Sequence, residues 1–386
     1  MNKGDGLLTL KFSAMQWCYW SLWGSFLTFA GMYMGSRGAG YSVIGTALSL
    51  AILGGIAGQV FWGFLCDKLK NIKYVLICAH IILWLIIMSF MLVISSGVMF
   101  GMYALLGFCL IPMVGLLDSW IIQKGKTAGL NYGFIRLWAS AGFTVNAIIL
   151  GRLINFFGYN VMFIAVTLYA AVIIFLASIT SDASIVRVKI KLKKEYSGLL
   201  ANKRFLTLLV GGFLIGLCLE GIDKLMAVIV QNIGGSAGDY GLIVASASLM
   251  EIPSLFLSGK LIKRFGMRNI FLIAVSIYIA QYIILSIADS VPALMLCMAF
   301  QGIAFGLWLP NLRAFVDANA TENMRTSAQT LTDGVTGGAA GVIAVFTGAR
   351  VIEIFGVRAM SVCLIILMAC AALVLLNVKS TNAIQG

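Results

Sequence analysis

The sequence predicts an all-α membrane protein, with twelve transmembrane helices in two pseudo-symmetric bundles of six. Of its 386 residues, 61% are hydrophobic and only 11% are charged. Ordinary soluble domains carry about 25% charged residues. The apolar residues form runs of about 20, the length that spans a bilayer as a helix, separated by charged or Gly/Pro breaks. Composition, apolar runs and an internal repeat together indicate this fold class.

Twelve apolar runs are the candidates for the transmembrane helices. Each is long enough to cross the hydrocarbon core as a helix. They begin near Phe12, Ser42, Tyr74, Met99, Phe134, Val161, Phe205, Tyr240, Ile270, Val291, Ser327 and Val357.

An internal repeat divides these runs into two sets. The segment RLINFFG at Arg152 recurs as RVIEIFG at Arg350, about 200 residues later. A long basic stretch lies near the middle of the chain. We therefore expect an N-terminal six-helix bundle over residues 1–180, a basic cytoplasmic linker over 181–204 and a C-terminal six-helix bundle over 205–386.

The net charge of +13 is distributed asymmetrically between the loops. Most basic residues fall in alternate loops, which is the positive-inside pattern and predicts that both termini are cytoplasmic. The excess of positive charge then indicates contact with anionic membrane lipid, and no nucleic acid partner is required. The basic loops contain Lys68, Lys70, Lys73, Lys124, Lys126, residues 187–204, Lys260, Lys263, Arg264, Arg268 and Arg325, whereas the opposite loops hold Arg37, Arg152, Arg350 and Arg358.

One arginine lies inside an otherwise uncharged apolar run, between Tyr132 and Phe143. An arginine at mid-membrane depth costs about 3 kcal/mol on insertion scales, so Arg136 is predicted to face a cavity or a partner acid. Asp118, in the preceding run, is the predicted partner. Ser140 and Phe143 share a helix face with Arg136 and would offer a hydroxyl and an aromatic surface. The alternative is an ion pair that only holds two helices together.

The second half has its own acids within apolar runs. Glu220 and Asp223 share one helix face with Lys224, so this group can neutralise itself. Glu251 lies near mid-span, with no Lys or Arg within a helical turn of it in the sequence. Burial favours the neutral form of a carboxyl group, which suits a proton carrier. Glu251 is otherwise a protonated acid bonded to a neighbouring helix. Asp333 is either a second proton site or a cap-like acid near the cytoplasmic mouth.

Other side chains have weaker assignments. Trp23, in the aromatic-rich first span, is predicted to line the cavity, although helix packing also explains these aromatic residues. Arg313 and Asp317, four residues apart, are interpreted as a helix-end pair. The eight cysteines have neither disulfide nor metal-site spacing, and no P-loop or nucleophile–base pattern is present. The sequence therefore predicts no enzyme activity, metal or cofactor.

The second span ends in GFLCDKLKNIK, residues Gly63 to Lys73. This segment resembles the signature loop between helices 2 and 3 of the major facilitator superfamily, with Gly63, Asp67 and Lys73 at the expected places. The resemblance implies that these three residues form a conformational gate, which latches helix ends and controls the inward opening.

Five further segments resemble the bacterial nucleoside:proton symporters and the related lactose permease and phenylpropionate permease groups. They are LWGSFLT at Leu22, PMVGLL at Pro112, IRLW at Ile135, NKR at Asn202 and RTSAQ at Arg325. The spacing of Asp118 and Arg136 also matches the galactoside-binding acid and arginine of the lactose permease. The nucleoside-symporter resemblance implies a substrate site with Arg136, Ser140, Phe143, Glu251 and Phe305.

The chain departs from the symporter pattern at two places. Glu220 and Asp223 stand where the family has amide residues, which makes the expected cavity more acidic. Gly306 stands at the position of the family's proton-linked aspartate. Proton coupling is therefore predicted at Glu251, with Asp223 and then Asp333 as the next candidates.

Together these features predict a secondary active transporter that works by alternating access. We expect proton-coupled uptake of a small polar solute, nucleoside-like or sugar-like, by a monomer in the bacterial inner membrane. An exporter of drugs or metabolites by proton antiport is the alternative, because an acidic, aromatic cavity also suits lipophilic cations. A membrane sensor or scaffold is a third interpretation.

Overall fold

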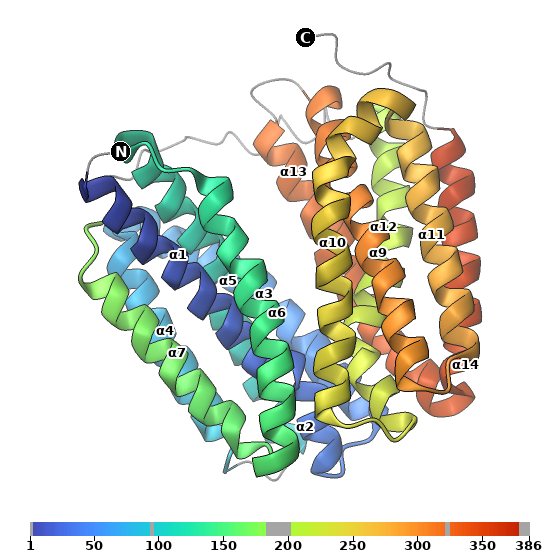
Figure 1. Cartoon of the computed structure of the whole chain (residues 1–386), viewed down its shortest axis with the longest axis horizontal. Coiled ribbons are helices and arrows are strands. Elements are labelled where there is room, and N and C mark those ends of the chain that lie inside the picture. Colours follow the sequence, from blue (N-terminus) through green and yellow to red (C-terminus); the bar gives the residue numbers. More distant parts are fainter. Residues whose placement is uncertain (1–2, 93–95, 183–201, 321–324, 378–386) are drawn as a thin grey trace. The chain divides into compact units, whose positions relative to one another are not determined.

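The computed structural model describes residues 3–92, 96–182, 202–320 and 325–377 (Figure 1). These residues are nearly all helical, with no β-strand among them. Their first part contains α1 (Lys3–Trp23), the π-helix η1 (Gly24–Thr28), α2 (Ala30–Ser36), α3 (Tyr41–Leu69), α4 (Ile72–Ser89), α5 (Ser96–Ala128), α6 (Tyr132–Phe157) and α7 (Asn160–Ser178).

The second part repeats this bundle of long helices. It contains α9 (Lys203–Asn232), α10 (Ala237–Phe265), α11 (Met267–Ile287), α12 (Val291–Asn319), α13 (Arg325–Asp333), the π-helix η3 (Gly334–Ala339) and α14 (Ala340–Leu376).

Ten helices of the described residues are long and apolar enough to cross a membrane. The predicted first span is not among them, because η1 interrupts it between α1 and α2. The predicted last two spans fall within one apolar stretch, Ala328–Leu376, in which Gly356 has a non-helical backbone with φ 81°. The all-helical membrane fold is thus confirmed, whereas the count of twelve spans stays a prediction.

The chain divides into two compact units. The first is Met1–Val188 with Ser236–Gly241, and the second is Lys189–Gly235 with Leu242–Gly386. The predicted linker, residues 181–204, lies mostly outside the described residues, so its role stays a prediction.

Glycines bring helix backbones into direct contact in the first unit. A Cβ added at Gly54 or Gly58 of α3 would lie 1.9 or 2.1 Å from a backbone oxygen of α5. At Gly107 of α5 it would lie 1.8 Å from the Ala51 carbonyl. Small residues spaced four apart permit such close packing in membranes, where helices gain little from burying apolar surface against one another.

In the second unit, glycines bring helix backbones into contact in the same way. A Cβ at Gly216 of α9 would lie 2.0 Å from the Thr336 carbonyl of η3. At Gly306 of α12 it would lie 2.9 Å from the Glu251 carbonyl of α10. Only glycine fits at position 306 without displacing α10. The symporter resemblance implies a proton-linked acid at this position, and this chain has no room for one.

The loop between α3 and α4 is held from both sides. Lys70 ends α3 in the left-handed conformation, with φ 51°, and Asn71 caps α4 by accepting a hydrogen bond from the Tyr74 N–H at 2.7 Å. Lys73 Nζ donates to the Ser178 carbonyl at the end of α7, and Asp67 is exposed. The loop charges of the first unit thus tie helix ends together, as a gate needs, but gating by Gly63, Asp67 and Lys73 stays a prediction.

Candidate functional site

Arg136 of α6 lies against an aromatic surface. Its guanidinium carbon is 4.5 Å from the centroid of the Trp20 ring. Trp20 in turn stacks on Trp23, with centroids 5.7 Å apart and planes inclined by 29°, and meets Phe143 edge-on at 6.5 Å. A cation over an indole face is stabilised by the ring quadrupole, and this contact leaves guanidinium N–H donors available for hydrogen bonds.

Asp118 of α5 lies near Arg136, and Tyr132 interacts with both residues. Its carboxylate accepts a hydrogen bond from Gln16 Nε2 at 2.7 Å. The Tyr132 hydroxyl interacts electrostatically with both Asp118 and Arg136. The two charged groups interact electrostatically, but the described residues include no direct ion pair between them. The expected neighbours therefore lie close, with a tyrosine linking them.

The sequence did not lead us to predict that Tyr132 and Gln16 belong to this site. Tyr132 begins α6 and lies one helical turn before Arg136, so the four-residue spacing was a signal that could have found it. Gln16 is a buried amide on α1, far from Asp118 in sequence, and no local pattern marks it.

Asn146 is a further buried polar residue of α6. Its Oδ1 accepts hydrogen bonds from Ser25 Oγ at 3.2 Å and Tyr169 Oη at 3.1 Å. A Cβ added at Gly24 would lie 3.2 Å from Asn146 Nδ2 and 3.2 Å from a ring carbon of Phe143. The π-helix η1 therefore begins with a glycine where α1 passes closest to these two side chains.

Two further residues were predicted from the symporter resemblance, Ser140 and Phe305. Ser140 is exposed on α6, and its carbonyl accepts a hydrogen bond from Thr144 Oγ1 at 2.8 Å. Phe305 is half-buried on α12 of the second unit. Their roles in substrate binding stay predictions.

In the second unit, Glu220 and Asp223 share one cation. Lys224 Nζ is 3.9 Å from Glu220 Oε2 and forms a closer ion pair with Asp223. A Cβ at Gly337 of η3 would lie 3.8 Å from Glu220 Oε1, so the acid faces the π-helix. Lys224 thus pairs with both acids, as the spacing predicted, and the fully ionised group keeps one negative charge.

Glu251 is half-buried on α10, at the level where α10 meets the glycines of α12. It interacts electrostatically with Tyr278 of α11. Tyr278 was not anticipated, since it lies in another apolar helix and has no sequence signal that relates it to Glu251.

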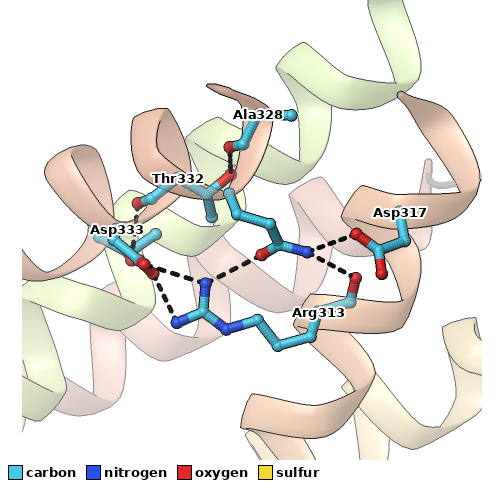
Figure 2. Close-up of polar contacts among 7 residues, drawn as sticks. Arg313, Asp317, Ala328, Thr332 and Asp333 are labelled. Carbon is cyan, nitrogen blue, oxygen red and sulfur yellow. Dashed lines mark hydrogen bonds and ion pairs between the residues drawn. The ribbon is translucent and has the colours of Figure 1, made fainter. Parts of the chain in front are cut away.

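Asp333 forms the best-defined ion pair in the described residues. Figure 2 shows the Arg313 guanidinium forked onto the Asp333 carboxylate, with N–O distances of 2.8 and 3.0 Å. The expected pairing of Arg313 with Asp317 is wrong. Asp317 instead accepts a hydrogen bond from Gln329 Nε2 at 2.8 Å, and Gln329 also bonds to Arg313.

This geometry favours a structural role for Asp333. A bidentate pair holds both carboxylate oxygens, and it joins the end of α12 to α13. Its function in proton coupling stays a prediction.

Charged groups inside apolar helices mark substrate or ion pathways in membrane proteins, and repeated helical bundles are typical of secondary active transporters of small solutes. The chain belongs to the MFS_1 like family, whose model matches residues 9–382. The resemblance to the major facilitator superfamily is thereby confirmed.

Relatives and solved structures agree with this assignment. The chain is 25% identical to the maltose permease of Geobacillus stearothermophilus over 329 residues, 84% of each protein. It is 22% identical to the nucleoside permease NupG of Escherichia coli K12 over 390 residues, covering 90% of this chain and 88% of NupG. The crystal structure of NupG superposes with a TM-score of 0.84 at 18% identity, over 97% of this chain and 98% of that one. A D-xylose-proton symporter superposes with a TM-score of 0.77 at 13% identity, over 97% and 98%.

Proposed function

We propose that this protein takes up a small, hydroxyl-rich solute of the sugar or nucleoside class together with protons. The observation that carries the proposal is the group formed by Arg136, Trp20, Tyr132 and Asp118 in the first unit. The indole offers a face on which a sugar or base can stack. The guanidinium and the carboxylate offer charged partners for hydroxyl groups, and such hydrogen bonds are about twice as strong as neutral ones.

The names of the relatives support this class of solute. A maltose permease and nucleoside permeases act on molecules that combine a ring with several hydroxyls. The printed name of a structural neighbour, a D-xylose-proton symporter, supports proton coupling. A phenylpropionic acid transporter is also a relative, so aromatic acids belong in the same screen.

The test uses purified protein in liposomes with an imposed pH gradient. Labelled uridine, maltose, xylose and phenylpropionate are offered in turn, and a shift in melting temperature reports binding independently. We expect one of the first three to accumulate, and a protonophore to abolish the accumulation. Gradient-driven loss of the bound solute would instead establish the exporter. Binding of only lipophilic cations would contradict the proposed solute class.

Glu251 is the proposed coupling residue, because it lies near mid-span, is half-buried and interacts electrostatically with Tyr278. Glu251→Gln mimics the protonated side chain. The variant should lose accumulation but retain exchange of labelled for unlabelled solute. Asp333→Asn is the control and should accumulate solute. If Glu251→Gln still concentrates solute, coupling belongs to Asp223 or Asp333.

The same proposal includes the placement of the chain. The distribution of basic loops supports cytoplasmic termini and basic loops on anionic lipid. The proposed form is a monomer in the bacterial inner membrane. A fluorescent protein fused to the C-terminus should fold and emit, because its folding requires the cytoplasmic side. A dark fusion in intact, well-expressed protein would reverse the topology.

A further inference from the structure

Helix α11 buries three polar side chains inside the second unit. Tyr278, Gln281 and Tyr282 are each 0% exposed. Tyr278 Oη, Tyr282 Oη and Gln281 Oε1 have no hydrogen-bond partner in the described part of the chain. Spacings of three and four residues place the three side chains on one helical face. Three such atoms on one face indicate a shared partner.

Two of the surrounding groups come from α12. Gln281 Nε2 donates to Gln301 Oε1 at 3.1 Å, and Cys297 Sγ lies 3.6 Å from the Gln281 carbonyl. The contact of Nε2 orients the Gln281 amide. Its Oε1 is then a buried acceptor with no donor in the described residues.

Glu251 of α10 packs close to this group. A Cβ added at Gly302 of α12, the residue after Gln301, would lie 3.0 Å from the Glu251 backbone nitrogen. Tyr278 interacts electrostatically with Glu251 and with Cys218 of α9. Tyr282 is coupled to Cys218, to Tyr278 and to Cys297. The titratable groups that face the cluster are therefore one carboxyl, two phenols and two thiols, contributed by four helices.

The energetics favour a bound water molecule. A buried polar atom left without a hydrogen bond costs about 1–3 kcal/mol, and about 90% of buried polar groups have a partner. Water can donate to Gln281 Oε1 and exchange hydrogen bonds with either phenol. Buried waters make about three hydrogen bonds to otherwise unsatisfied groups, which is the number of atoms available here.

We propose that α11 lines an internal water site, through which Tyr278 and Tyr282 relay protons to and from Glu251. In each transfer a water or phenol O–H bond breaks as an O–H bond forms on the Glu251 carboxylate. The donor regains a proton from the next group in the chain, so every hydroxyl stays neutral and no electrons move. The relay rests on the proposed function, in which Glu251 binds the coupled proton and the two tyrosines pass protons to and from it.

The test removes each hydroxyl without removing a ring. Tyr278→Phe and Tyr282→Phe are compared with wild type in lipid nanodiscs by infrared difference spectroscopy between two pH values. Glu251→Gln identifies the carboxyl band of Glu251. We expect this band and its pH midpoint to shift in Tyr278→Phe and, to a smaller degree, in Tyr282→Phe. In liposomes, proton-driven uptake should slow by about tenfold, whereas solute exchange should stay within twofold of wild type.

Tyr103→Phe is the matched control. Tyr103 of α5 is also 0% exposed with an unpartnered hydroxyl in the described residues, but its electrostatic neighbour is Tyr33 and not an acid. This control separates loss of any buried hydroxyl from loss of the relay. Size-exclusion profiles of all variants exclude misfolding as a cause.

Two different results would overturn the relay. The first is a Glu251 band that Tyr278→Phe and Tyr103→Phe leave equally unchanged. The second is the absence of any band that Glu251→Gln removes. Proton-driven accumulation by wild type with either result would leave the proposed function intact. A shifted band in a protein that never accumulates solute would support the water site and contradict proton-coupled uptake.

Discussion

Each unit holds an arginine and an acid about 20 residues apart, Asp118 with Arg136 and Arg313 with Asp333, in opposite order. In the second unit the arginine forks directly onto the carboxylate. In the first unit it lies on the Trp20 ring, and Tyr132 links it to the acid. A guanidinium that pairs with both oxygens of a carboxylate holds two helices together. A guanidinium that contacts an aromatic ring and a phenol keeps N–H donors available for a ligand.

The largest expected effect is a difference in solute affinity between lysine variants of the two arginines. Arg136→Lys should lose about 100-fold in solute affinity, since a charge-assisted contact contributes about 1.5–3 kcal/mol and an ammonium cannot reproduce a planar fork. Arg313→Lys is the matched control and should bind solute within about threefold of wild type. Isothermal titration of both variants checks this. Equal losses of solute affinity in the two variants would contradict the assignment of Arg136 to solute binding and of Arg313 to a structural ion pair.

The next effect concerns how each pair is coupled. Double-mutant cycles of Arg313→Gln with Asp333→Asn should give a coupling of about 1 kcal/mol or less, because both side chains are 40% or more exposed. Cycles of Arg136→Gln with Asp118→Asn should give a larger coupling, since removing one half-buried charge leaves the other uncompensated. Denaturant unfolding in mixed micelles measures both. Simple additivity for Arg136 and Asp118 would show that Tyr132 does not connect them.

Tyr132→Phe tests that connection directly. Loss of one hydroxyl that interacts with both charges should weaken solute binding by about fivefold, given about 1 kcal/mol for a polar contact of this kind. Tyr74→Phe, on an exposed tyrosine of α4, should change nothing. Equilibrium binding of labelled solute compares the two variants. If Tyr132→Phe binds as wild type does, Arg136 and Asp118 act independently of it.

The smallest expected effect is a charge exchange in the second unit. The double variant Arg313→Asp with Asp333→Arg keeps opposite charges between α12 and α13, so its melting temperature should return to within about 2 °C of wild type, roughly the shift that 0.5–1 kcal/mol produces in a large domain. Each single change should lower it more. A double variant worse than either single change would mean that Gln329, which bonds to both Arg313 and Asp317, fixes the polarity of the pair.

The sequence predicted the helical membrane fold because apolar composition and run length act locally on each helix. It also predicted that Arg136 lies near Asp118 and that Lys224 pairs with its acidic neighbours, because short loops and helical spacing determine these contacts. Helix breaks were harder to predict. The first span is divided by η1, and no propensity at Gly24–Thr28 distinguishes a π-turn from an α-turn.

Contacts between distant helices could not be predicted from spacing. Gln16 with Asp118, Arg313 with Asp333 and Tyr278 with Glu251 depend on how helices rotate against each other. That rotation is determined by glycine contacts such as Gly306 with α10, which only the packed structure displays. The charged partner nearest in sequence, Asp317, was therefore the wrong one for Arg313.

The two π-helices act as phase shifts along their helices. One extra residue advances the following face by about 100°, since a regular turn holds 3.6 residues. Both sides of each π-helix are packed inside the protein. Tyr19 and Leu22 precede η1 and Phe29 follows it, and all three are buried. Thr332 precedes η3 and Ala340 follows it, and both are fully buried. Each π-turn therefore sets which side chains of the following helix meet their neighbours. Deleting Gly24 or Gly334 would rotate that following helix and turn its buried residues away from their partners.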